Sequence, residues 1–199
     1  MALPIDATQR TTIRIAPVLL AVAALCVGPG PAAADNTGER SPRTTTGQFS
    51  NASNGLACDG IVAQANGNTQ SQTFSLYGLS VPANATITGI MLRVRANDGA
   101  DNNRNFLISL SWDGGQRFTG AAQTPDFESN APLRDFYVGG SKALWGHAWT
   151  RAELSDKSFR VKLQAGMPGG SSPINLDCPP VTVFYEFPTP PPRRPSKEP

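Results

Sequence analysis

The chain has 199 residues and a formal net charge of +2 at pH 7. Between residues 35 and 187 it carries 12 basic and 13 acidic residues. A body so close to neutral has no basic stripe with which to replace the counterions along phosphates, so the composition argues against a nucleic-acid partner.

Residues 1–34 have the features of an export signal. Arg10 and Arg14 precede an apolar run over residues 15–27, and the segment ends in alanines, so we expect cleavage after Ala34. The apolar run is shorter than the roughly 20 residues that a membrane-spanning helix needs. The sequence therefore predicts a signal peptide, a secreted or cell-surface location, and no membrane span after cleavage.

The cysteines fit the same compartment. Cys26 lies in the predicted signal peptide, and its lipidation is disfavoured because Leu25, not a small residue, precedes it. Cys58 and Cys178 remain in an oxidising setting, so we predict that they form a disulfide. In the chain-entropy model, closing a loop of about 120 residues stabilises the fold by about 4 to 5 kcal/mol.

Short runs of alternating apolar and polar residues follow one another along the chain. Runs at 61–65 and 73–79 are separated by a polar turn, as in a hairpin. The clearest strand covers 85–98, where one face carries four apolar residues, namely Ile90, Leu92, Val94 and Ala96. Residues 106–112 and 181–186 repeat the alternation.

About eight short strands with no alternation of strands and helices predict an all-β fold. We expect a single antiparallel β-sandwich of jelly-roll or immunoglobulin-like kind, with one short helical turn, over residues 55–187. Residues 35–54 are polar and are expected to form a leader that contributes at most one edge strand. Residues 188–199 are Pro-rich and predict a disordered tail or a ligand for a proline-binding partner.

Residues 137–163 are the best-specified stretch. Gly139 and Gly140 indicate a turn, and Trp145 and Trp149 follow with the spacing of a packed corner. Residues 150–153 match the S/T-x-x-E capping box, which predicts one helical turn over about 150–156. From residue 159 the chain alternates again and re-enters a strand.

A calcium site is one candidate for the polar turn after the 85–98 strand. Its oxygen-bearing side chains are Asp98, Asp101, Asn102 and Asn103. They do not match the D-x-D-x-D-G loop, so a plain hairpin turn is favoured and no cofactor is expected. One histidine and two bonded cysteines also leave too few ligands for a zinc site.

A hydrolase is the third of three functional hypotheses. Asp113 with Asp126 or Glu128 could form a carboxylate pair for glycoside hydrolysis, although nothing in the sequence fixes their separation. His147 stands without a G-x-S-x-G motif or an acid placed to orient it, so we interpret it as a turn residue.

The tryptophans carry the second hypothesis, a carbohydrate-binding module. Trp112 falls on the apolar face of its strand and is expected in the core. Trp145 and Trp149, with His147 between them, are the candidate ligand-binding residues. This hypothesis requires an exposed tryptophan beside residues 120–133, which are expected to form a long loop.

Two motifs also carry a family resemblance. The segments VPANATITGIMLRVRA and YVGGSKALWGHAWTRAEL, followed by FRVKL and VTVFYE, resemble a β-sandwich module of secreted bacterial proteins and bacteriophage tail or virion-associated proteins. The resemblance covers about residues 60–187 and implies a non-catalytic module for display or adhesion. The chain departs from the pattern at Ala143, where an acidic residue often precedes Leu-Trp-Gly.

The first hypothesis is therefore an exported, non-catalytic structural or interaction module at the cell surface or in the extracellular space. Its partner would be a protein or a glycan of unknown identity.

Overall fold

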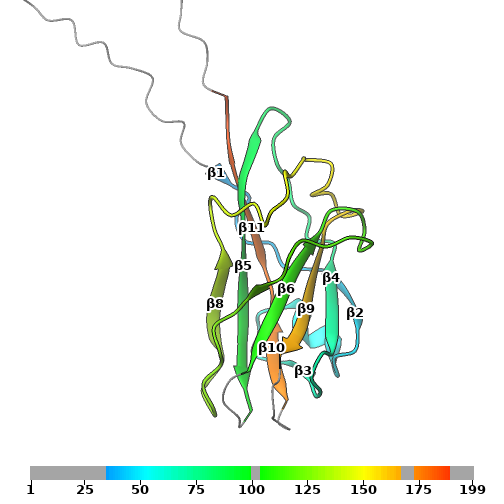
Figure 1. Cartoon of the computed structure of the whole chain (residues 1–199), viewed down its shortest axis with the longest axis vertical. Helices are drawn as coiled ribbons and strands as arrows, with labels where there is room; N and C mark the ends of the chain where they lie inside the picture. The colour runs from blue at the N-terminus through cyan, green and yellow to red at the C-terminus, as the bar shows by residue number, and fades with distance from the viewer. Residues whose placement is uncertain (1–34, 100–103, 167–172, 189–199) are drawn as a thin grey trace, which may run out of the picture. The chain divides into compact units, whose positions relative to one another are not determined.

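The computed structural model describes residues 35–99, 104–166 and 173–188 (Figure 1). The predicted signal peptide and the predicted tail from residue 189 onward lie outside these residues. In the part of the chain that is described, no helix is both long and apolar enough to cross a membrane.

Two antiparallel sheets make up the fold, as the alternating pattern predicted. One sheet, called sheet A here, contains six strands: β1 (Asp35–Asn36), β3 (Ala63–Ala65), β5 (Thr86–Asp98), β8 (Arg134–Gly139), β10 (Ile174–Cys178) and β11 (Val181–Glu186). Sheet B has the order β2-β4-β9-β6-β7: β2 (Thr44–Gly47), β4 (Ser71–Ser75), β9 (Arg160–Gly166), β6 (Asn105–Ser111) and β7 (Ala122–Gln123).

The long strand β5 organises sheet A. Leu92 pairs with Val181 of β11 and with Val138 of β8, so these two strands lie on opposite edges of β5. Strand β10 continues along the β11 edge, where Ala96 pairs with Leu176. The buried faces of the two sheets enclose one hydrophobic core, and the predicted inward residues of β5 are fully buried in it: Ile90, Leu92, Val94 and Ala96.

The polar segment 35–54 is more than the predicted leader. It supplies two edge strands, β1 on sheet A and β2 on sheet B, and a 3-10 helix, η1 (Ala52–Leu56), begins at its end. Phe49 is buried and stacks on Phe106 at 5.8 Å. Edge strands need backbone pairing on one side only, which is why a polar sequence can form them.

The helical turn predicted at 150–156 is not present as a helix. The capping box forms, because the Thr150 N–H donates to Glu153 Oε2 at 2.7 Å and the Glu153 N–H donates to Thr150 Oγ1 at 3.4 Å. The residues that follow make successive turns, and the chain then enters β9. The expected loop 120–133 likewise contains β7 and the buried Phe127.

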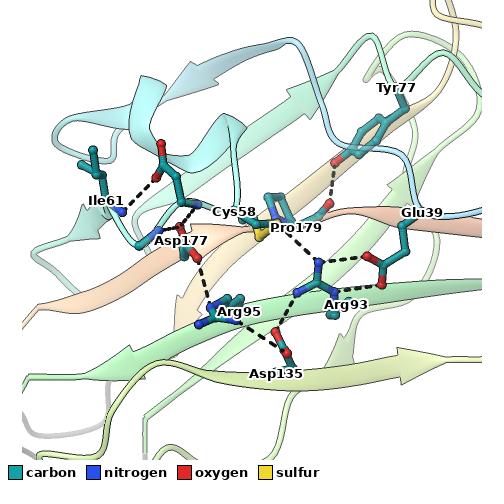
Figure 2. Close-up of a disulfide and its surroundings, with 12 residues drawn as sticks. Glu39, Cys58, Ile61, Tyr77, Arg93, Arg95, Asp135, Asp177 and Pro179 are labelled. Atoms are coloured by element: carbon teal, nitrogen blue, oxygen red, sulfur yellow. Dashed lines mark hydrogen bonds and ion pairs between the residues drawn. A yellow bond between two sulfur atoms is a disulfide. The ribbon is translucent and has the colours of Figure 1, made fainter.

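The predicted disulfide between Cys58 and Cys178 is confirmed (Figure 2). It joins the segment after η1 to the end of β10 across a sequence separation of 120 residues. The Cα atoms lie 5.1 Å apart.

Candidate functional site

The corner, defined as residues 139–149, is fastened to one peptide of β5. The Ile90 N–H donates to Ala143 O at 3.0 Å, and the Ile90 carbonyl accepts the Gly140 N–H at 3.1 Å. The same carbonyl also accepts the indole N–H of Trp145 at 2.9 Å. The backbone polar groups of Ile90 are therefore all used to hold the corner.

Glycine at position 89 makes this close crossing possible. A Cβ there would collide with the Gly140 carbonyl oxygen and stand only 2.7 Å from the Lys142 nitrogen. Both obstacles are backbone atoms, which cannot rotate away. Gly89 of the first motif and Gly140 of the second thus belong to one contact, a relation that neither motif reveals alone.

Trp149 is a packing residue. It is 7% exposed, its indole N–H donates to Leu144 O at 2.8 Å, and its ring meets Phe159 edge-on at 5.7 Å. Its ring is therefore not a surface on which a ligand could stack.

Trp145 is half-buried and lines an open hollow of about 360 Å³, which we call the Trp145 hollow. Small residues form the rest of its lining: Gly120, Ala121, Ala122, Gly139 and Ala143. Trp145 has a φ of +57°, a conformation that is costly for a bulky residue. The structure thus places the half-buried Trp145 beside residues 120–122, whereas the carbohydrate hypothesis expected an exposed tryptophan next to this segment.

His147 lies in an aromatic stack on the other side of the corner. Its ring stacks on Trp112 at 4.2 Å and meets Trp149 edge-on at 4.9 Å, and its Nε2 lies 3.2 Å from Glu153 Oε1. The expectation that no acid orients His147 was wrong, because the capping-box glutamate does so. Trp112 packs against the core but stays half-buried, with the Arg117 guanidinium 5.3 Å from its ring centre.

Glu153 interacts with both Thr150 and His147. Burial acts to raise its pKa, but hydrogen bonds from the Thr150 N–H and hydroxyl, together with His147, outweigh burial and lower it. An ionised Glu153 therefore closes the capping box and orients the histidine ring.

The carboxylates of the hydrolase hypothesis do not converge. Asp113 accepts hydrogen bonds at the end of β6, from Ser111 and Arg117, whereas Asp126 accepts one from Asn105 at the start of the same strand. Six residues of strand separate those ends, roughly 20 Å at about 3.3 Å per residue, far beyond the spacing of a catalytic pair. Glu128 pairs with Arg134 at 2.9 Å.

Asp98, the first candidate calcium ligand, is fully buried. Its Oδ2 lies 3.6 Å from Nε of the equally buried Arg104. Asp101, Asn102 and Asn103 fall outside the described residues, so the calcium site stays a prediction. Within the described ranges, no group of three or more metal-binding side chains is found.

A second, larger hollow of about 600 Å³ lies between the turns at 79–83 and 150–155, and we call it the hydroxyl hollow. Ser80, Thr150 and Ser155 contribute hydroxyls and Arg151 contributes a guanidinium. No motif predicted this hollow, because its two walls are about 70 residues apart in the chain.

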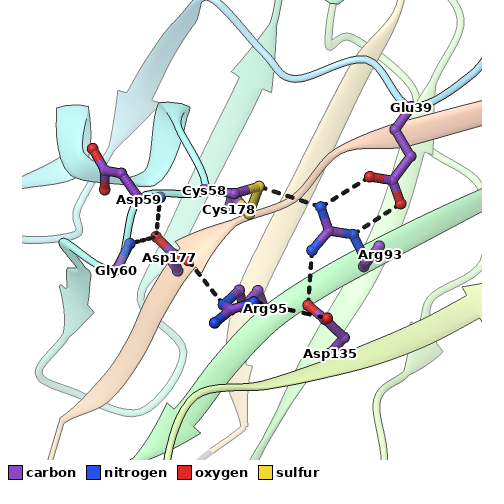
Figure 3. A network of polar contacts seen from close by, with 9 residues as sticks. All are labelled: Glu39, Cys58, Asp59, Gly60, Arg93, Arg95, Asp135, Asp177 and Cys178. Atoms are coloured by element: carbon purple, nitrogen blue, oxygen red, sulfur yellow. Dashed lines mark hydrogen bonds and ion pairs between the residues drawn. A yellow bond between two sulfur atoms is a disulfide. The ribbon is translucent and has the colours of Figure 1, made fainter.

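The outer face of sheet A carries a polar network around the disulfide that the sequence analysis also missed (Figure 3). Arg93 donates to both carboxylate oxygens of Glu39 at 2.9 Å and to Asp135 at 2.8 Å. The hydrogen bond to Glu39 raises the pKa of Arg93, and the hydrogen bond to Asp135 raises it further. Burial acts in the opposite direction but is outweighed. Arg95 lies 3.1 Å from the buried carboxylate of Asp177.

Comparison with known proteins finds no matching family model and no match among curated proteins. Among solved structures, a chitosan-binding module from a chitosanase/glucanase of Paenibacillus sp. IK-5 has 12% identity and a TM-score of 0.39, over 71% of this chain and 96% of that chain. The family 32 carbohydrate-binding module of C. perfringens NanJ, in complex with galactose, has 12% identity and a TM-score of 0.42, over 73% and 98%. A family 29 module from Piromyces equi has 13% identity and a TM-score of 0.35, over 77% and 91%.

Proposed function

We propose that the chain is a non-catalytic binding module of the extracellular space and that it binds a saccharide in the Trp145 hollow. One observation carries this proposal: the indole of Trp145 is fixed by its hydrogen bond to Ile90 O, and the half-buried residue lines an open hollow together with glycines and alanines. The sequence predicted an interaction module whose partner is a protein or a glycan, and we propose that this partner is a glycan.

A fixed aromatic ring is a suitable platform for a sugar. The C–H face of a pyranose ring packs on the face of an indole, and Trp145 has already lost its rotational freedom in the free protein. Binding therefore costs little additional side-chain entropy. The volume of about 360 Å³ falls within the range of small-ligand sites, roughly 300 to 1,000 Å³.

The ionisable groups favour binding over hydrolysis. The carboxylates of Asp113 and Asp126 lie at opposite ends of β6, and Glu153 is engaged by Thr150 and His147. None of these carboxylates lines the Trp145 hollow. The disulfide supports an oxidising, extracellular location.

A glycan-array screen of the chain, followed by tryptophan fluorescence titration of each hit, tests the proposal. We expect Trp145→Ala to weaken saccharide binding at least about tenfold, the equivalent of a contact worth about 1.4 kcal/mol. Trp149→Phe is the control, because Trp149 is buried and its substitution should leave the saccharide affinity unchanged. No bound saccharide, or equal affinity in the Trp145→Ala variant, would overturn the proposal.

A protein partner is the second candidate, and Tyr137 favours it. Tyr137 is 59% exposed on β8, directly opposite Arg93 in the strand register. Tyrosine and arginine are enriched in protein interfaces. A pull-down with the wild-type chain and a Tyr137→Ser variant separates the two candidates, because this substitution should leave saccharide binding unchanged.

A further inference from the structure

We propose that Cys58 is the sulfur through which thiol–disulfide exchange enters the Cys58–Cys178 crosslink, and that the crosslink closes in a sandwich that is already folded. The partner chemistry is a disulfide oxidant, either a small molecule or an oxidoreductase. This inference is independent of the saccharide proposal.

The two cysteines of the crosslink differ in exposure. Cys58 is an exposed residue in the segment after η1, whereas Cys178 at the end of β10 is 0% exposed. Exchange proceeds by in-line attack of one sulfur on another, so an external partner must be able to reach the sulfur that it attacks or that attacks it. Of the two residues, only Cys58 is exposed in the folded state, so we assign it the contact with the external partner.

Asp177 holds the Cys58 segment in place without the covalent bond (Figure 3). Its carboxylate is nearly fully buried and accepts the N–H groups of Asp59 at 3.1 Å and Gly60 at 2.9 Å. The Ile61 N–H donates to Asp59 Oδ1 at 2.9 Å, which closes the turn. Because these bonds do not involve sulfur, they can keep Cys58 beside Cys178 in the reduced protein.

Arg93 provides a cation at the sulfur of Cys58. Its Nη2 lies 3.4 Å from Cys58 Sγ, and its position is fixed by Glu39 and Asp135 (Figure 2). A guanidinium that donates to sulfur stabilises the thiolate, which is the reactive form of cysteine. Arg93 is therefore a positioning residue that favours Cys58 as the attacking group.

The exchange then runs in two steps. The Cys58 thiolate attacks an oxidant disulfide RS–SR, which forms the Cys58–S–S–R bond and releases RS⁻. The Cys178 thiolate next attacks Cys58 Sγ, which forms the Cys58–Cys178 bond and releases the second RS⁻. Two electrons pass from the protein thiols to the oxidant, and the two thiol protons leave to solvent.

Competitive alkylation tests the order of reaction. The full chain carrying Cys26→Ser is reduced, treated with a limiting amount of iodoacetamide under native conditions, and mapped by peptide mass spectrometry. We expect Cys58 to be labelled at least about ten times faster than Cys178, and the ratio to fall to about one in denaturant. A native ratio near one, or a preference for Cys178, would overturn the proposal, and so would loss of the folded state on reduction.

Two variants in the same background separate the roles of the polar groups. Arg93→Met should slow alkylation of Cys58 several-fold and leave Cys178 unchanged. Asp177→Asn should lower the effective concentration of the thiol pair in a glutathione redox buffer by about tenfold, because the Cys58 segment loses its anchor. An unchanged effective concentration in the folded Asp177→Asn protein would contradict the preorganised site.

Discussion

Two segments are attached to sheet A by different interactions. The corner is held mainly by backbone hydrogen bonds and close packing, whereas the Cys58 segment is held by a disulfide and by charged side chains. The corner at 139–149 is bound to Ile90 by backbone hydrogen bonds, by an indole N–H and by the space that Gly89 leaves open. The Cys58 segment is bound to β10 by a covalent bond and by the Asp177 carboxylate, and it contacts β5 through the Arg93 guanidinium. The first fastening fixes the indole that we propose as a sugar platform, and the second holds the sulfur that we propose as the entry point of thiol–disulfide exchange.

The largest expected effect is loss of the crosslink. Replacing Cys58 and Cys178 by serine together should lower the free energy of unfolding by about 4 kcal/mol, because the unfolded chain regains the entropy of a 120-residue loop. Urea unfolding of the double variant against the wild type measures this. A loss below about 1 kcal/mol would contradict the assignment of this stabilisation to the entropy of the unfolded chain.

Gly89→Ala should have the next largest effect. The added Cβ meets the backbone of Gly140 and Lys142, so the corner must move away from Ile90, at a cost of about 3 kcal/mol. Gly120→Ala is the matched control, because no heavy atom lies within 4 Å of a Cβ at position 120. Equal unfolding midpoints for the two variants would show that the corner is not held by this crossing.

The smallest expected effect comes from acid titration near the corner. The pKa of Glu153 is lower in the folded than in the unfolded chain, so its contribution is present above about pH 4.5 and is lost as the pH falls through the folded pKa. Glu153→Gln should therefore be less stable than the wild type at pH 7, by less than about 1 kcal/mol, and equally stable in acid.

Asp113 offers an internal comparison for that titration. Hydrogen bonds from Arg117 lower its pKa to about 2, so its contribution should persist to a lower pH than that of Glu153. Unfolding midpoints of Glu153→Gln, Asp113→Asn and the wild type are measured from pH 7 to pH 2. As the pH falls, Glu153→Gln should reach the wild-type midpoint first, and Asp113→Asn should reach it at a lower pH. Convergence in the reverse order would contradict the assigned hydrogen bonds.

The sequence was most informative where structure depends on neighbours along the chain. The alternation from Ile90 to Ala96 predicted β5 and its buried face, and the capping box at Thr150 and Glu153 formed as expected. The disulfide followed from the predicted compartment and from the two cysteines that remain outside the predicted signal peptide. Each of these signals is local or compositional.

The features that the sequence did not predict depend on contacts between segments that are distant in the chain. Strand β2 has a polar sequence and forms because β4 offers it a backbone edge. The separate environments of Trp145 and Trp149 arise because the Ile90 carbonyl holds one indole while Phe159 and the core surround the other. The Arg93 network likewise joins residues from four separate segments, so no single motif could reveal it.

The measurement that tests the central claim most directly is a saccharide titration of two hollow-filling variants. Gly120→Leu fills the Trp145 hollow at a position with no heavy atom within 4 Å, and Ala83→Leu places the same side chain in the hydroxyl hollow. We predict that Gly120→Leu weakens binding at least about tenfold with an unchanged unfolding midpoint, while Ala83→Leu binds like the wild type. Wild-type affinity in Gly120→Leu, with binding lost in Ala83→Leu, would contradict the Trp145 hollow as the binding site.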